Sequence, residues 1–291
     1  MHLALLGYPL SHSLSPAMHN AALAEVRLND WRYDAMPVEP GRLAEAVAAI
    51  RGEDYAGANV TVPHKEAIVP FLDGLTPVAQ TIGAVNTVVK VGAKHASPSL
   101  TGHNTDAAGL LADLYLHDVH ISRRPVLILG AGGAARAAVA ACAGAYAGAH
   151  IRVVARRREQ AQSLISLDPS LEIFDWSPVG FMQACDDCAL IINTTPLGMT
   201  PNADASPWLD GTPFPPDAFV YDLVYNPAET LFTRQAQEAG LRAATGLGML
   251  VEQGALAFEM WTGKTAPRDV MRRAAETRLL ANFPLPISNP Q

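Results

Sequence analysis

The chain of 291 residues is 49% hydrophobic and 17% charged, a composition typical of globular proteins and not of disordered ones. Its length suits two domains rather than one small core. The formal net charge of −7 argues against binding to nucleic acid or to anionic membranes, so any anionic ligand must be held by local groups.

The N-terminal stretch MHLALLGYPL has no basic region and reaches Gly7, Tyr8 and Pro9 too early for a signal peptide. No apolar run approaches the roughly 20 residues that are needed to cross a bilayer. We therefore expect a cytoplasmic protein, either a monomer or a homodimer, that does not bind membranes.

The first part of the chain alternates expected strands with expected helices. Strands are expected at residues 3–7, at 31–38, around Val60 and Val62, and at 84–91. Helices are expected at residues 16–26, 41–50 and 65–72, the first with Ser15 as its N-cap and Pro16 after it. The stretch GAKHASPS (residues 92–99) predicts a hairpin-like turn. This alternation indicates a largely parallel α/β sheet.

A second α/β unit begins near residue 124. Its expected strands are at 125–129, 150–155, 171–176, 188–194 and 218–224, with a helix after the glycine-rich turn at 130–133. The loop over residues 198–216 is long enough to be a mobile flap. Helices return from residue 246, and the final residues read as a frayed tail.

These elements predict a two-domain α/β fold. A substrate domain is expected over residues 1–106, completed by C-terminal helices over 246–285, and a Rossmann-type, doubly wound dinucleotide domain over 107–245. Residues 286–291 form the tail.

The cysteines do not predict a metal site. Cys185 and Cys188 stand in CDDC, a spacing that also suits half of a zinc site or a redox pair. A zinc site needs further ligands at matching spacing, and none follows. Cys188 leads into the apolar stretch ALIIN, which favours simple burial. We expect no bound metal and, with Cys142 as an odd third cysteine, no disulfide framework.

The stretch GAGGAARA predicts a dinucleotide site. Gly130, Gly132 and Ala135 form a G-x-G-x-x-A pattern between an apolar strand and a helix. Gly130 permits the tight turn, Gly132 lets a pyrophosphate approach the backbone, and the helix N-terminus offers free N–H groups. The residues expected at the cofactor are Gly130, Ala131, Gly132, Gly133 and Ala134.

The second strand of this unit favours NADP over NAD. An NAD site places Asp or Glu at the end of this strand, where the sequence has Ala155, Arg156, Arg157 and Arg158. A guanidinium can bind the 2′-phosphate of NADP through two hydrogen bonds. A solvated basic helix start is the alternative, since Glu159 dilutes the cluster.

Four further motifs place polar residues beside a turn-forming Gly or Pro: GYPLSHSLSPAMHN (7–20), GANVTVPHK (57–65), GAVNT (83–87) and GHNTDAAG (102–109). Ligands bind at such strand ends in α/β sheets. With NTTPLGM (193–199), YDLVYNP (221–227) and GLGMLVEQGALAFEMWTG (246–263), these motifs resemble the shikimate dehydrogenase family over residues 7–263. The resemblance implies NADPH-dependent reduction of 3-dehydroshikimate to shikimate.

The resemblance also implies residue roles. Lys65 and Asp106 would act at the reacting oxygen. Substrate would be bound at its carboxylate by Ser13 and Ser15, at its ring hydroxyls by Asn59, Thr61, Asn86 and Gln253, and along its side by Tyr225. Cofactor would be bound by Arg156, Arg157, Thr194, Leu223, Gly246 and Met249, besides the glycine-rich turn.

Chemistry supports the implied roles of Lys65 and Asp106. Lys65 can donate a proton to the developing alkoxide and stabilise it as a cation, with Asp106 orienting the amine. A surface ion pair is the alternative. The sequence departs from the family at Ala155, Arg156 and Arg157, where Asn-Arg-Thr is usual, and this leaves the adenine contacts undetermined.

Two other functions are compatible with this reading. One is a related dehydrogenase that oxidises quinate as well as shikimate. Quinate has an additional hydroxyl, which would lie between Ser13 and Ser15. The other, from a different class, is a dinucleotide-sensing regulator without catalysis. Retention of both Lys65 and Asp106 argues against the regulator.

Overall fold

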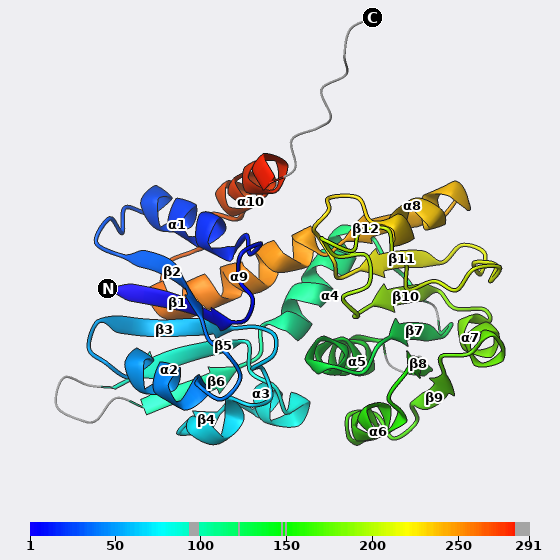
Figure 1. Cartoon of the computed structure of the whole chain (residues 1–291), viewed down its shortest axis with the longest axis horizontal. Helices are drawn as coiled ribbons and strands as arrows, with labels where there is room; N and C mark the ends of the chain where they lie inside the picture. Colours follow the sequence, from blue (N-terminus) through cyan, green and yellow to red (C-terminus); the bar gives the residue numbers. More distant parts are fainter. Residues whose placement is uncertain (93–98, 122, 147, 149, 283–291) are drawn as a thin grey trace, which may run out of the picture.

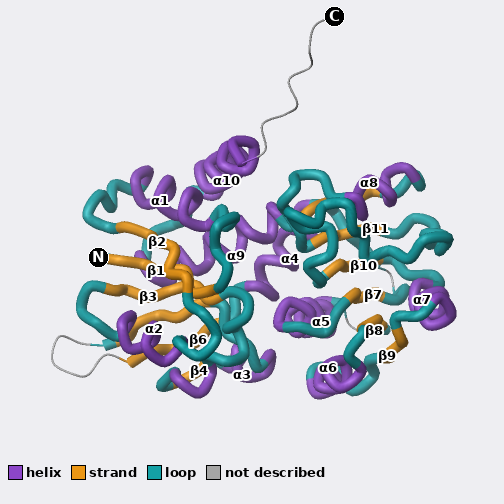
Figure 2. Tube along the Cα trace, viewed as in Figure 1, coloured by secondary structure: helices purple, strands orange, loops and turns teal. Residues whose placement is uncertain are grey.

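The computed structural model describes residues 1–92, 99–121, 123–146, 148 and 150–282 (Figure 1). The centre of the turn expected over residues 92–99 and the tail at 286–291 lie outside these residues. Two α/β units lie side by side, with helices α4 (Asp106–Leu116) and α9 (Leu247–Thr262) between them (Figures 1 and 2).

Twelve strands in the described ranges form two six-stranded sheets. The first sheet contains β1 (His2–Gly7), β2 (Arg32–Pro37), β3 (Tyr55–Val60), β4 (Gly74–Leu75), β5 (Thr87–Val91) and β6 (Ser99–His103). The second contains β7 (Val126–Leu129), β8 (Ile151–Ala155), β9 (Glu172–Asp175), β10 (Leu190–Asn193), β11 (Phe219–Asp222) and β12 (Arg242–Thr245).

Helices connect and cover these strands. They are α1 (Ser15–Glu25), α2 (Leu43–Ile50), α3 (Pro77–Ile82), α4 (Asp106–Leu116), α5 (Gly133–Ala145), α6 (Arg158–Gln162), α7 (Pro178–Cys185), α8 (Leu231–Glu238), α9 (Leu247–Thr262) and α10 (Arg268–Asn282). Short 3₁₀ turns lie at Val69–Phe71 and Ser163–Ser166.

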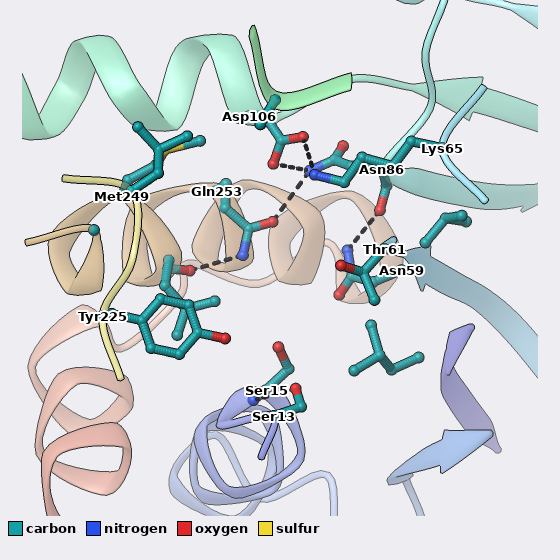
Figure 3. A pocket seen from close by; sticks show the side chains of 16 residues that line it. Ser13, Ser15, Asn59, Thr61, Lys65, Asn86, Asp106, Tyr225, Met249 and Gln253 are labelled. Carbon is teal, nitrogen blue, oxygen red and sulfur yellow. Dashed lines mark hydrogen bonds and ion pairs between the residues drawn. The ribbon is translucent and has the colours of Figure 1, made fainter. Parts of the chain in front are cut away.

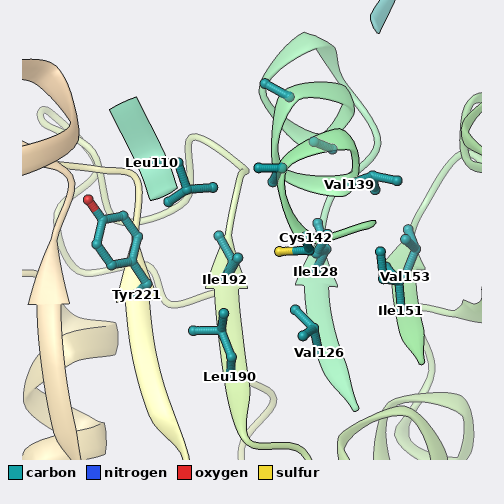
Figure 4. Close-up of a cluster of buried hydrophobic side chains, with 14 of the residues drawn as sticks. Leu110, Val126, Ile128, Val139, Cys142, Ile151, Val153, Leu190, Ile192 and Tyr221 are labelled. Carbon is teal, nitrogen blue, oxygen red and sulfur yellow. The ribbon is translucent and has the colours of Figure 1, made fainter. Parts of the chain in front are cut away.

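The second sheet has the doubly wound topology that the sequence predicts. Its order is β12-β11-β10-β7-β8-β9, all parallel. The strand VLIL is buried along its whole length because both sheet faces are covered. Val126 and Ile128 pack with α4 and α5 (Figure 4). Leu127 and Leu129 pack with α7 and α8 on the other face.

The first sheet is mixed, in the order β2-β1-β3-β5-β6-β4. Only β5 among its strands runs antiparallel to its neighbours, β3 and β6. Leu3 and Leu5 face α1 and α9, and Ala4 and Leu6 face α2. The C-terminal helices therefore cover the sheet that is built from the N-terminal third of the chain.

The structure corrects three local expectations. The helix expected over residues 65–72 is a series of turns with 3₁₀ residues Val69–Phe71, because Pro70 has no N–H to donate within a helix. Strand β3 ends at Val60, so Val62 is not part of a buried strand and is 67% exposed. Ser15 is the first residue of α1 and does not cap it; Leu14 occupies the cap position.

The loop over residues 198–216 packs against the hydrophobic core of the second unit. Trp208 in this loop is buried and stacks on Phe214, with ring centroids 4.2 Å apart. Within the described residues, no helix is long and apolar enough to cross a membrane.

Candidate active site

A pocket of about 200 Å³ lies between the first sheet, at the ends of β1 and β3, and the segments that follow β11 and β12 of the second sheet (Figure 3). It is lined by Leu5, Ser13, Ser15, Asn59, Val60, Thr61, Lys65, Asn86, Asp106, Ala134, Leu223, Tyr225, Gly246, Met249, Leu250 and Gln253. The structure thus brings together every residue that the sequence assigns to catalysis or to substrate, along with four assigned to the cofactor.

The Lys65–Asp106 pair lies at one end of the pocket. Lys65 follows β3, and Asp106 begins α4. The Lys65 Nζ donates to Asp106 Oδ2 at 2.7 Å, and the two side chains are 17% and 6% exposed. The pair is therefore no solvated surface ion pair. Asp106 also lies at the N-terminal end of α4, where the helix dipole favours a negative charge.

Amide side chains connect this pair to the middle of the pocket (Figure 3). Asn86 Nδ2 lies 2.9 Å from Asp106 Oδ1 and 3.1 Å from Gln253 Oε1. The main-chain N–H of Thr105 donates to Asn86 Oδ1 at 2.7 Å, and Gln253 Nε2 donates to the Leu250 carbonyl. The amide orientations are therefore fixed before a ligand binds.

Two serines form the opposite end of the pocket. Ser13 lies before α1 and its Oγ accepts from the Ser15 main-chain N–H at 3.3 Å. Since Ser15 does not cap α1, its hydroxyl is available for other contacts. Tyr225 approaches from the second unit, and burial raises the pKa of its phenol to about 12, so the phenol stays protonated at neutral pH. Neutral donors thus surround the space beside the serines.

The glycine-rich turn borders the pocket from the second unit. Gly130 has φ +112°, and a Cβ there would lie 2.6 Å from Thr194 Oγ1, so only glycine suits the position. A Cβ at Gly132 would meet no atom within 4 Å, which leaves open space before the N-terminus of α5. Gly133, which begins α5, packs near the stem of Lys65.

The arginines after β8 are exposed. Arg158 pairs with Asp175 at 3.0 Å. Among the residues that the structure describes, neither Arg156 nor Arg157 has a side-chain partner. Arg157 is the residue before α6, so both free guanidiniums stand beside a helix start that follows the second strand of the sheet. This is where the sequence predicts them.

Some of the residues around the pocket were not predicted. Leu5, Val60 and Leu250 supply apolar walls, and no polar motif marks them. Thr105 stands beside Asp106 in the HNTD motif and could have been inferred from it. Tyr33, whose hydroxyl donates to Asn59 Oδ1 at 2.8 Å, has no local signal because 26 positions separate the two residues.

The three cysteines are buried and unbridged. Within the described part of the chain, no cluster of three or more His, Cys, Asp or Glu side chains could hold a metal ion.

Two family models match separate parts of this chain. The family model of the shikimate dehydrogenase substrate binding domain matches residues 5–88, and that of the shikimate 5'-dehydrogenase C-terminal domain matches residues 246–276. The shikimate dehydrogenase (NADP(+)) of Moorella thermoacetica is 45% identical over 93% of this chain and 90% of its own.

Solved structures share the whole fold. Shikimate 5-dehydrogenase from Thermus thermophilus, crystallised in complex with NADP(H) and shikimate, has a TM-score of 0.84 and 38% identity, covering 96% of this chain and 100% of that one. The ligand-free 5-ketofructose reductase of Gluconobacter sp. strain CHM43 has a TM-score of 0.79 and 32% identity, covering 95% and 98%. On both its sequence and its fold, the chain belongs to the shikimate dehydrogenase family.

Proposed function

We propose that this protein is an NADP-dependent shikimate dehydrogenase, which interconverts 3-dehydroshikimate and shikimate. The observation that carries the proposal is the 2.7 Å Lys65–Asp106 pair, which lies in a pocket of neutral hydrogen-bonding side chains beside the start of α5. A small carboxylate with several hydroxyls needs such neutral partners, because each buried polar group left unpaired costs about 1–3 kcal/mol.

The site has the groups for this chemistry. NADPH supplies a hydride when it is bound. Lys65 would protonate the ketone oxygen as it becomes an alkoxide, and Asp106 would hold the amine and accept a hydrogen bond from the resulting hydroxyl. Because the two groups are in direct contact, the proton is assigned to the pair rather than to one residue.

The proposed binding roles follow from position. Ser13 and Ser15, at the end of the pocket away from Lys65, would bind the carboxylate. The ring hydroxyls would contact Asn59, Thr61, Asn86 and Gln253, with Tyr225 beside the ring. In this arrangement, the reacting carbon lies between the Lys65–Asp106 pair and the second unit.

The cofactor residues fit NADP. The open space at Gly132 and the N-terminus of α5 suit a pyrophosphate, and the free guanidiniums of Arg156 and Arg157 suit the 2′-phosphate. Leu223, Gly246 and Met249 line the same pocket as Lys65 and would contact the nicotinamide end, while Thr194 lies against the glycine-rich turn. We also propose the division into residues 1–106 with 246–285 and residues 107–245.

A panel of steady-state measurements tests the proposal. Absorbance at the reduced nicotinamide band is followed with shikimate or quinate against NADP or NAD. We expect turnover of shikimate with NADP, and far less with quinate or with NAD. Absence of shikimate turnover in a folded protein that binds NADP would favour the regulator, and comparable rates with quinate would favour the broader dehydrogenase.

A further inference from the structure

The amide of Asn59 is fully engaged by the protein on its nitrogen side. Asn59 Nδ2 donates to the main-chain carbonyl of Asn86 at 3.1 Å and to Thr87 Oγ1 at 3.2 Å. A main-chain carbonyl can only accept a hydrogen bond, so the nitrogen must face Asn86 and both its protons are used. What remains for a ligand is the oxygen, Oδ1.

A buried tyrosine holds that oxygen. Tyr33 on β2 is 1% exposed, and its hydroxyl donates to Asn59 Oδ1 at 2.8 Å. Burial raises the pKa of Tyr33 well above its usual value, an effect that Ser15 only partly opposes, so the phenol remains a donor. Tyr33 does not itself line the pocket.

The position of Tyr33 is fixed on two sides. Asn20 of α1 accepts from the Tyr33 main-chain N–H at 2.9 Å and donates to its carbonyl at 2.8 Å. The imidazole of His19 stacks on the phenol ring, with centroids 4.3 Å apart and 11° between the planes. Within the described residues, both ring nitrogens of His19 lack hydrogen-bond partners, so His19 holds Tyr33 by shape alone.

We propose that Tyr33 is a positioning residue for substrate recognition. Its hydroxyl fixes Asn59 so that this amide can only accept a hydrogen bond from the ligand. Asn59 thereby selects a ring hydroxyl that donates at this point, and rejects a group that only accepts. The inference rests on the proposed function, because it assigns part of the specificity for shikimate.

Tyr33→Phe tests this proposal, since it removes the hydroxyl and keeps the ring under His19. Losing one neutral hydrogen bond should raise the KM for shikimate by about three- to tenfold, with kcat within about twofold and the KM for NADP unchanged. If the parent enzyme turns over shikimate and the Tyr33→Phe variant keeps the parental KM for shikimate, the positioning role is refuted and the proposed function stands. No turnover by the parent would instead refute the proposed function.

A double-mutant cycle with Asn59→Ala separates positioning from general stability. If Tyr33 acts through Asn59, Tyr33→Phe should add little to the KM of the Asn59→Ala enzyme. Effects that multiply would overturn the proposal. Thr87→Val, which removes an acceptor on the nitrogen side of the same amide, should raise the KM for shikimate in the same way, and decides the matter if Tyr33→Phe does not fold.

Tyr221→Phe is the matched control. Tyr221 is also fully buried, and its hydroxyl donates to Asp113 at 2.7 Å, outside the pocket lining. Both Tyr→Phe variants should lower the melting temperature, but only Tyr33→Phe should change the KM for shikimate. An equal rise in the KM for shikimate in both variants would mean that the effect comes from a general loss of stability, and it would refute the specific role of Tyr33.

Discussion

The two sides of the pocket are built in different ways. On the side of the first sheet, Lys65, Asp106, Asn86 and Asn59 are held by one another through hydrogen bonds of 2.7–3.1 Å. On the side of the second sheet, a glycine turn faces open space, and Arg156 is exposed. One side is ordered before a ligand arrives, whereas the other offers main-chain N–H groups and free charge.

This difference matches the proposed ligands. A small ring with several hydroxyls is recognised through hydrogen bonds of defined direction, so the side chains that bind it must be oriented in advance. A dinucleotide carries several negative charges on an extended body, and helix N-termini and guanidiniums bind these with less demand on geometry. Changes on the first side should therefore affect chemistry or shikimate binding, and changes on the second side should affect NADP binding.

The largest effect is expected at Lys65. Lys65→Met keeps the stem of the side chain and removes the amine, so kcat should fall by roughly 10²–10⁴ while the KM for shikimate changes little. NADP affinity, measured by fluorescence titration, should not change. Asp106→Asn should be comparably harmful, and the double variant scarcely worse, if the pair acts as a unit.

Lys90→Met is the control for this experiment. Lys90 on β5 donates to the carbonyls of Gly52 and Tyr55, away from the pocket, so its loss should leave kcat unchanged. Near-parental kcat in Lys65→Met would refute the acid–base role of the amine. Losses that multiply in the Lys65 and Asp106 double variant would mean two independent roles.

The second effect concerns the cofactor side. Arg156→Asp removes a free guanidinium and adds a repulsive charge, so the preference for NADP over NAD should fall roughly 10- to 100-fold, with the KM for shikimate unchanged. The ratio of kcat/KM for the two cofactors measures it.

Arg42→Asp gives a matched charge reversal on the first unit, where Arg42 pairs with Glu45 at the surface. It should leave the cofactor preference at the parental value. If Arg156→Asp also leaves that preference unchanged, the 2′-phosphate is held elsewhere, and Arg157 is the next residue to change.

The third effect is on stability and comes from His19. Burial lowers the pKa of His19 to about 3, whereas an exposed histidine titrates near 6.5. Between these values the unfolded state binds more protons than the folded state, so this histidine's contribution to stability is lost as the pH falls below 6.5. At pH 5 the loss relative to neutral pH should be about 2 kcal/mol.

His19→Phe keeps a ring stacked on Tyr33 and removes the titrating group. Urea unfolding at pH 7 and pH 5 should show that the variant loses about 2 kcal/mol less than the parent between the two pH values. An equal loss in the two proteins would mean that His19 is protonated in the folded state or that it titrates normally.

The sequence predicted the parts of this molecule that are encoded locally. The turn at Gly130 and the doubly wound order of the second sheet follow from a glycine pattern and apolar runs a few residues long. The structure brings Lys65 and Asp106 together as their motifs indicate, although their catalytic roles stay predictions. Contacts between distant segments could not be predicted in this way, and Tyr33 behind Asn59 is the clearest example.

Local rules also failed where two of them conflicted. Residues 65–72 contain helix formers, but Pro70 cannot donate within a helix, so the segment forms turns. Ser15 precedes Pro16 as an N-cap serine would, yet the helix begins at Ser15 itself. The second correction leaves the role implied for Ser15 at the carboxylate in place, because a hydroxyl that does not cap the helix is available for substrate.

The smallest effect is therefore expected at Ser15. In the proposed orientation, the carboxylate lies far from the reacting carbon and would be held alike in the ground state and the transition state. Ser15→Ala should accordingly raise the KM for shikimate, by about tenfold, more than it lowers kcat. Since the Ser15 side chain does not cap α1, circular dichroism should show parental helix content.

Ser11→Ala is the control, since Ser11 belongs to the same loop but is exposed and outside the pocket, and it should leave the KM for shikimate unchanged. A fall in kcat with an unchanged KM in Ser15→Ala would place Ser15 at the reacting end and reverse the proposed orientation of the substrate. Lys65 would then face the carboxylate, and we would expect Lys65→Met to weaken shikimate binding rather than to lower kcat. The two variants thus test the same orientation from opposite ends of the pocket.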